Sequence, residues 1–262
     1  GASAAFGRRT LKVLENLGFQ TRALFNTHAH ADHCGGNRYI QETTGCPIYA
    51  SQIEAAFIEN PLLIPYGLFS ASPIKALKNK YLMPEASRVD FRLEEGELFI
   101  DDACFKIIPL PGHSLGHTGI ITPDNILFAG DSLTSIHILK EFPFLYLADV
   151  EKHLDTLNIL KGLSLEQVSL THGGLQNNIS EVIDYNYQIL MNLLEYILEV
   201  IKLPREREEI LSLVVERFNL PLNRNQYVLI LASISAFLSY LCNTKQAKVY
   251  TENNCLLFKG LT

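Results

Sequence analysis

The sequence lacks the features that mark secreted and membrane proteins. Its five cysteines are scattered and odd in number, and no CxxC pair is present, so they indicate reduced thiols in the cytoplasm. Residues 1–19 form an amphipathic pattern without the apolar core of a signal peptide. The longest apolar run, residues 227–242, contains three serines. It is shorter than the roughly 20 residues that cross a bilayer, so it predicts a buried helix.

An excess of positive charge is also missing. The net charge is −6, which argues against a protein that coats nucleic acid or an anionic membrane. No internal repeat or low-complexity tract is present. The 262 residues, 47% of them hydrophobic, suffice for one large domain or for a medium and a small one, with a substantial core.

Short apolar segments separated by turn residues predict a layered mixture of strands and helices. Residues 60–90 are irregular and rich in proline, with one expected helix at 74–79, and a loop of that length is more often functional than idle. The predicted strands are 23–25, 47–50, 91–93, 97–100, 105–110, 120–121, 126–128 and 168–170. The predicted helices are 8–17, 51–57, 149–161 and 180–202.

Pro204 marks the expected boundary between a domain of residues 1–203 and a C-terminal module of residues 204–262. Two helices, 206–218 and 222–242, followed by a hairpin at 247–258, predict a winged-helix-like module. From residue 201 onward, eight Lys and Arg stand against five Glu. The second helix carries one basic residue, whereas a helix that reads DNA needs polar side chains. We therefore expect the module to cap the active site or to join two copies in a homodimer, without binding nucleic acid.

The stretch THAHADHCGG, residues 27–36, contains three of the eight histidines in the chain. Alternate residues of an extended loop point the same way, so His28 and His30 can aim at one point. Asp32 and His33 lie past the turn and can aim at a second. Imidazole nitrogens and carboxylate oxygens bind zinc, and iron or manganese where oxygen ligands are plentiful.

Further ligands for such a cluster must come from other parts of the chain. Three motifs meet this need: Pro111-Gly112-His113, Ala129-Gly130-Asp131 and Thr171-His172-Gly173, each after a predicted apolar strand. Gly35 and Gly36 are expected to let the backbone turn sharply into the next helix.

The motif HxHxDH, followed in order by His113, Asp131 and His172, resembles that of the metallo-β-lactamase fold superfamily over about residues 8–190. The resemblance implies an α+β fold, a four-layer αββα sandwich. Members normally begin with several strands, which end in an aspartate-containing turn before the first helix. Here the first helix begins almost at once, so we expect those opening strands to be missing from this chain.

The resemblance also assigns the ligands of a dinuclear site. His28, His30 and His113 would hold one metal, Asp32, His33 and His172 a second, and Asp131 would bridge the two together with a water or hydroxide. Two divalent ions, zinc by preference and iron or manganese as alternatives, would supply hydroxide near neutral pH without a serine or cysteine nucleophile. Asp32, Asp131 and His117 are the candidate catalytic residues.

Within the superfamily, His33 is typical of the glyoxalase II-like, lactonase and RNase Z-like branches. Flavodiiron proteins carry glutamate where His30 stands, and the stretch PGHSLGHTG resembles that of thioesterases. We therefore expect a metal-bridging hydroxide to attack a small-molecule thioester, ester or lactone. The alternatives are a phosphodiesterase or nuclease of the same fold, a one-iron persulfide dioxygenase-like oxidoreductase, and a non-catalytic regulator that uses the C-terminal module.

Three histidines, one cysteine and one segment lie outside the predicted ligand set and need an interpretation of their own. His117 is either a hydrogen-bonded structural residue or one that faces the substrate. His137 lies either at the rim of the site or on the surface. We expect His153 to be solvated on its helix and Cys34 to pack in the core. Residues 57–81 form either a substrate lid or a surface insertion.

Overall fold

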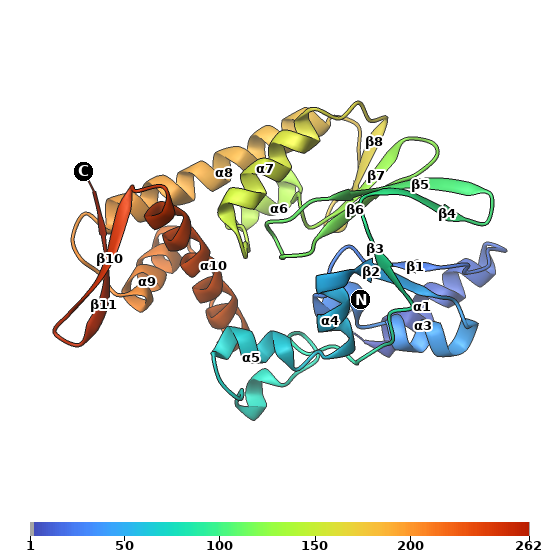
Figure 1. The fold of residues 1–262 in the computed structure, drawn as a ribbon, viewed down its shortest axis with the longest axis horizontal. Coiled ribbons are helices and arrows are strands. Elements are labelled where there is room, and N and C mark those ends of the chain that lie inside the picture. The colour runs from blue at the N-terminus through green and yellow to red at the C-terminus, as the bar shows by residue number, and fades with distance from the viewer. Residues whose placement is uncertain (1–2, 262) are drawn as a thin grey trace. The chain divides into compact units, whose positions relative to one another are not determined.

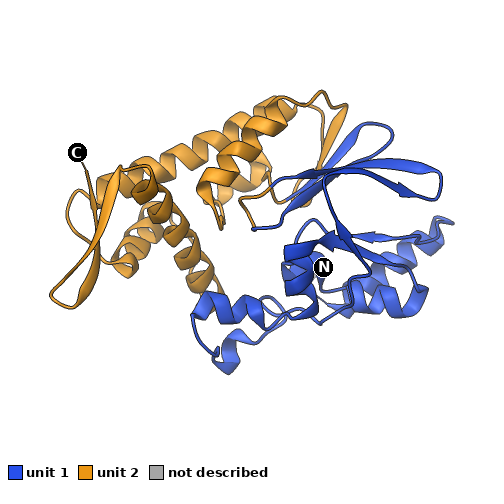
Figure 2. Ribbon diagram, viewed as in Figure 1, with its two compact units in different colours: residues 1–110, 115–130 blue, residues 111–114, 131–262 orange. Residues whose placement is uncertain are grey.

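The computed structural model describes residues 3–261, which form two compact units. Unit 1 holds the chain up to residue 110 together with 115–130, and unit 2 holds 111–114 together with the chain from 131 onward (Figures 1 and 2). The expected boundary at Pro204 does not separate these units, because both its sides belong to unit 2.

Unit 1 contains two sheets that share an apolar core. Leu93 of the first sheet packs with Ile107 and Ile120 of the second, as expected for the middle layers of a sandwich. The first sheet is parallel, in the order β1-β2-β3: β1 (Leu24–Phe25), β2 (Ile48–Ser51) and β3 (Phe91–Leu93). The second is antiparallel: β4 (Gly96–Ile100), β5 (Ala103–Pro109), β6 (Thr118–Ile121) and β7 (Ile126–Gly130).

Helices cover the first sheet of unit 1 on its other side. Ala55 and Ile58 of α4 (Gln52–Glu59) are buried against Ile48 and Ala50 of β2, and Cys34 completes this cluster, which confirms its expected packing role. The helix, sheet and sheet layers of the predicted sandwich are thus present within unit 1. Its helices are α1 (Ala4–Asn16), α2 (Ala31–Cys34), α3 (Asn37–Thr44), α4 (Gln52–Glu59), α5 (Leu63–Phe69) and the 3-10 turn η1 (Lys75–Leu77).

Helix α5 falls in the region that we expected to be irregular. Its Pro65 lies in the first helical turn, where a backbone N–H has no partner inside the helix and proline is tolerated. Tyr66 and Phe69 on this helix are exposed. Both interpretations of residues 57–81, lid and surface insertion, stay predictions.

Unit 2 is mainly helical and contains two antiparallel strand pairs. Helix α8 begins at the cap Asn178, whose side chain accepts the Glu181 N–H, and not at the expected Ser180. The first part of unit 2 contains α6 (Ile136–Glu141), α7 (Val150–Lys161), β8 (Gln167–Leu170), β9 (Gly174–Gln176) and α8 (Ile179–Val200). It ends with α9 (Arg207–Arg217), α10 (Arg224–Asn243) and the hairpin β10 (Ala247–Glu252) and β11 (Cys255–Gly260). The short elements α6 and β9 were not predicted.

One apolar core joins α8 to α9 and α10 across Pro204. Leu193 of α8, Val214 of α9 and Phe237 of α10 are fully buried in it, which confirms the prediction of a buried helix at 227–242. Within the described residues, α10 also has the length and composition of a membrane span, but core helices of soluble proteins pass that test as well. The two helices and the hairpin predicted after Pro204 are present, and their winged-helix arrangement stays a prediction.

Candidate metal centre

The histidine-rich loop of unit 1 runs from the end of β1 to the start of α3, and a buried amide pair closes it. Asn37 Nδ2 donates to Asn26 Oδ1 at 2.6 Å, and the reverse contact measures 3.4 Å. The loop is therefore held at both ends, just outside Thr27 and Gly36. Gly36 has an ordinary right-handed backbone, so the expected sharp turn is not the reason for this glycine. A Cβ there would lie 3.1 Å from Gly7 N of α1, so glycine permits the close approach of that helix.

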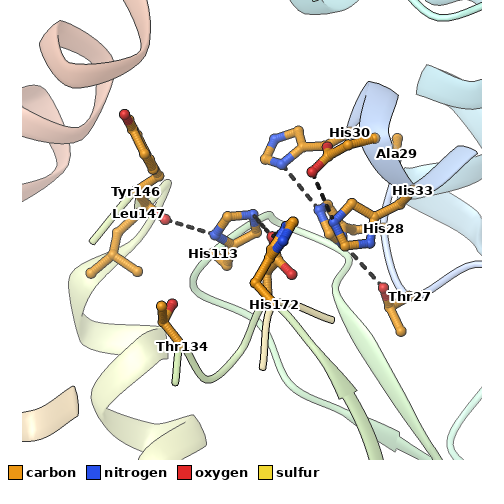
Figure 3. A network of polar contacts seen from close by, with 12 residues as sticks. Thr27, His28, Ala29, His30, His33, His113, Thr134, Tyr146, Leu147 and His172 are labelled. Carbon is orange, nitrogen blue, oxygen red and sulfur yellow. Dashed lines mark hydrogen bonds and ion pairs between the residues drawn. The ribbon is translucent and has the colours of Figure 1, made fainter. Parts of the chain in front are cut away.

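His28 and His30 point toward each other, as predicted (Figure 3). His28 Nε2 lies 3.0 Å from His30 Nδ1, and the His28 side chain is fully buried. Thr27 Oγ1 lies 3.1 Å from the other ring nitrogen of His28. Two imidazole nitrogens that converge in this way can face one cation, so this part of the donor set fits a metal.

Asp32 and His33 lie in the single turn of α2, past the bend of the loop. Asp32 Oδ2 is 3.5 Å from His33 Nε2, with half of the Asp32 side chain exposed and His33 largely covered. The rings of His28 and His33 are 3.9 Å apart between centroids. Unit 1 thus brings together the four polar side chains of the HxHxDH motif.

Glu54 of α4 holds two loops that carry functional residues, and sequence reasoning missed it. Its Oε2 accepts the Ala29 N–H between His28 and His30, and its Oε1 accepts the Gly116 N–H next to His117, both at 2.8 Å. The side chain is almost fully buried. In the sequence, Ser51 and Glu54 have only the spacing of a helix capping box, which gives no sign of this long-range role.

His117 lies behind His28 and is almost fully buried. Their rings stack at 5.0 Å between centroids. Gly130 has φ +56°, and a Cβ there would meet His117 Nε2 at 2.6 Å and Thr27 Oγ1 at 2.7 Å. This burial favours the structural interpretation of His117, and its place among the catalytic candidates stays a prediction.

His113 belongs to unit 2, in the loop after β5. Its Nδ1 lies 2.8 Å from the Tyr146 carbonyl oxygen (Figure 3). Because a carbonyl can only accept, Nδ1 carries the proton, and Nε2 keeps its lone pair for a ligand. Gly112 has φ +134°, and a Cβ there would lie 2.5 Å from His153 Cα. Glycine is therefore required beside this histidine.

Asp131 lies between two histidines of unit 2. Its Oδ2 is 3.7 Å from His113 Nε2 and 3.9 Å from His172 Nε2. The loop after Asp131 is fixed by the buried Asn186 of α8, which accepts the Thr134 N–H at 3.0 Å and donates to the Thr134 carbonyl at 2.8 Å. The three strand-end motifs thus place their polar residues as predicted, after β5, β7 and β8.

Two other histidines were assigned from sequence with different success. His137 is exposed and pairs with Glu141 at 3.6 Å. It therefore lies on the surface, which was one of its two interpretations, and not at the rim of the site. We expected His153 to be solvated, but it is fully buried beside Gly112, and within the described residues neither of its ring nitrogens has a hydrogen-bond partner. Burial, with a smaller effect of His113, lowers the pKa of His153 to about 3. Burial likewise raises the pKa of the Cys34 thiol to about 12.

Comparison with known proteins places this geometry in a family. Residues 1–172 match the family model described as the metallo-beta-lactamase superfamily. A hydroxyacylglutathione hydrolase of Methylococcus capsulatus is 27% identical over 128 residues, 48% of this chain and 39% of that protein. A probable metallo-hydrolase of Bacillus subtilis, YflN, is 27% identical over 175 residues, 60% of this chain and 66% of that protein. The chain thus spans less than two thirds of the length of these relatives.

A solved structure shows the same fold over nearly the whole chain. A metallo-beta-lactamase family protein of Thermus thermophilus superposes with a TM-score of 0.74 at 18% identity, covering 97% of this chain and 86% of that one. The expected metallo-β-lactamase fold is therefore confirmed, and the winged-helix arrangement of the C-terminal module stays a prediction. With about two thirds of its length matched by the family model, the chain belongs to the metallo-beta-lactamase superfamily.

Proposed function

We propose that the protein is a dinuclear metal-dependent hydrolase that cleaves thioesters or related carboxylic esters and lactones. The donor set carries this proposal, because imidazoles and carboxylates converge within each unit: His28 faces His30 in unit 1, and Asp131 faces His113 and His172 in unit 2. We propose the ligand sets that the family resemblance implies, with His28, His30 and His113 for one ion, Asp32, His33 and His172 for the other, and Asp131 shared by both.

Two bound cations would supply a nucleophile from water near neutral pH and would polarise the substrate oxygen. Two features of the chain suit such cations: the protonation of the His113 ring and the position of the Asp131 carboxylate. The Tyr146 carbonyl holds the His113 ring proton on Nδ1, which leaves Nε2 for the ligand. Asp131 contributes a carboxylate oxygen near two imidazoles, which suits a bridging ligand. The predominance of histidine favours zinc over magnesium or calcium.

The choice of thioesters rests on the curated relatives. The name hydroxyacylglutathione hydrolase describes cleavage of an acyl group from the sulfur of glutathione, which is a thioester. Our proposal extends only the bond type to this chain, because the match covers 39% of the Methylococcus capsulatus protein. The thiol or alcohol part of the substrate is left open.

A panel of substrates tests the proposal directly. Metal-replete protein is given an acyl thioester, a lactone and a bis-aryl phosphate side by side, and the same panel is repeated after chelation. We expect metal-dependent turnover of the thioester or lactone well above that of the phosphate. A clear preference for the phosphate diester would replace the proposal with a phosphodiesterase, and turnover that survives chelation would refute a metal-dependent reaction.

A further inference from the structure

The C-terminal helices are linked to the ligand His113 by residues 144–148, which we call the strap. Phe144, Leu145 and Leu147 of the strap are all buried in the core that also contains α8, α9 and α10. The Phe144 ring lies 6.5 Å from the Phe237 ring of α10, between centroids. The strap has no regular secondary structure, so its backbone position depends on this packing and on its hydrogen bonds.

The hydrogen bonds of the strap point in two directions. Toward residues 111–114, the loop that carries His113 and that we call the metal loop, the Tyr146 carbonyl accepts the His113 Nδ1 proton at 2.8 Å, and the Ala148 N–H donates to the Gly112 carbonyl at 2.8 Å. Toward the C-terminal helices, the Leu147 N–H donates to Ser233 Oγ of α10 at 3.0 Å. The Ser233 side chain is buried in the core of unit 2.

The Tyr146 carbonyl and the Leu147 N–H belong to the same peptide group. A peptide group is planar, and in the trans form its C=O and N–H point in opposite directions. Ser233 therefore fixes the N–H side of this planar peptide group, and the C=O side of the same group holds the ring of His113. Each hydrogen bond also polarises the group for the other, so the two reinforce each other in a low-dielectric interior.

We propose that Ser233 is a positioning residue for the metal ligand His113, and that the C-terminal helices thereby help to build the metal centre. This inference rests on the proposed ligand role of His113. Loss of the Ser233 hydroxyl leaves the buried Leu147 N–H without an acceptor, so the peptide is free to rotate away from His113. Removal of the group that orients a ligating histidine weakens metal binding by about 10- to 100-fold. Ser233 does not contact His113 itself but acts through the peptide group between Tyr146 and Leu147, so we expect an effect at the lower end, about tenfold.

The helix provides a matched control two residues further along. Ser235 Oγ donates to the Leu231 carbonyl at 2.9 Å and accepts from Arg207 Nη1 at 3.2 Å, and these bonds involve neither the strap nor the metal loop. Ser233→Ala and Ser235→Ala remove the same atom from the same helix. A general effect of losing a serine hydroxyl from α10 would appear in both variants.

Zinc affinity is measured for both variants by competition with a chelator, alongside thermal unfolding of the metal-free proteins. We expect Ser233→Ala to bind one ion about tenfold more weakly, and Ser235→Ala to bind both as wild type does. The inference is wrong if Ser233→Ala binds zinc as tightly as Ser235→Ala. If Ser233→Ala does not fold, Ser233→Cys is compared with Ser235→Cys, because sulfur is a weaker acceptor of similar size.

A second readout separates this inference from the proposed function. In metal-free protein labelled with 15N-histidine, the ring nitrogens of His113 report which one carries the proton. Wild type should show the proton on Nδ1, and Ser233→Ala should shift part of the population to Nε2. If metal-free Ser233→Ala has the same His113 tautomer as wild type, the role of Ser233 is refuted, whether or not the protein binds metal in a separate experiment. A wild-type protein that binds no metal refutes the proposed function, while the tautomer still decides this inference.

Discussion

Asp131 Oδ2 lies 3.7 Å from His113 Nε2, although the two residues belong to different strand-end loops. The same oxygen is 3.9 Å from His172 Nε2, and most of the Asp131 side chain is shielded from solvent. A shielded carboxylate oxygen that faces two imidazole nitrogens suits a negative ligand shared by two cations. This relationship makes Asp131 the most informative single residue of the proposed centre.

Substitution of Asp131 by alanine should remove at least one of the two metals and abolish hydrolysis, because no other carboxylate of unit 2 belongs to either proposed ligand set. Asp131→Asn keeps the shape but loses the charge, so it should retain metal more weakly than wild type. His137→Ala provides the control, since the exposed His137 pairs with Glu141 and belongs to neither proposed ligand set. Elemental analysis and the rate on the preferred substrate check this prediction. An unchanged metal count with full activity in Asp131→Ala would refute the bridging role.

Glu54→Gln should weaken both the fold and the metal site. The amide keeps one acceptor, but its NH2 group faces the N–H of either Ala29 or Gly116, which leaves a buried donor unpaired at a cost of about 1–3 kcal/mol in unfolding free energy. Because Ala29 stands between His28 and His30, zinc affinity should fall as well. Urea unfolding and chelator competition measure the two effects.

Glu59→Gln is the control for Glu54, on the same helix. Glu59 also accepts a backbone N–H, from Val89, and pairs with Arg92, but neither of these bonds is to a residue of the histidine loop. It should lose stability and keep the zinc affinity of wild type. Equal losses of zinc affinity in both variants would show that Glu54 acts on general stability alone.

His153 should make the metal-free protein sensitive to acid. Its pKa falls from 6.5 to about 3 on folding, mainly through burial, so in this range the unfolded chain binds the extra proton and acid favours unfolding. From about pH 7.5 to about pH 5 this one group should cost about 2 kcal/mol of stability.

His153→Leu removes this contribution. Among residues 3–261, neither ring nitrogen of His153 has a hydrogen-bond partner, so an apolar side chain of similar size leaves no group unpaired and should keep the stability at neutral pH. Urea unfolding of both metal-free proteins at the two pH values gives the difference. A variant that loses stability with acid as steeply as wild type would show that His153 is not the group responsible.

The proposed ligands could be picked out of the sequence because their signals are local. Each of His113, Asp131 and His172 follows an apolar strand and a glycine or threonine, and HxHxDH is a compact motif. The supports of the site were not predictable, because they join distant parts of the chain. Gly116 lies 62 residues from Glu54, and Ser233 lies 86 residues from Leu147. No periodicity or motif marks such pairs.

His153 shows a different limit of sequence reasoning. A histidine within a helix of mixed polarity reads as a solvated residue, but here it packs against Gly112, whose missing side chain makes the room. Helix α5 shows a third limit, since Pro65 and Gly67 obscured a helix that tolerates both. In each case a tertiary contact or a position within the first turn overrides the local pattern.

The metal content of the purified wild-type protein tests the central claim most directly. Elemental analysis of protein expressed with zinc, iron and manganese available should find two divalent ions per chain, with zinc preferred. A single iron with no second metal would contradict the dinuclear hydrolase and favour an iron-dependent oxidoreductase. A chain that holds no metal after supplementation would contradict the metal centre itself.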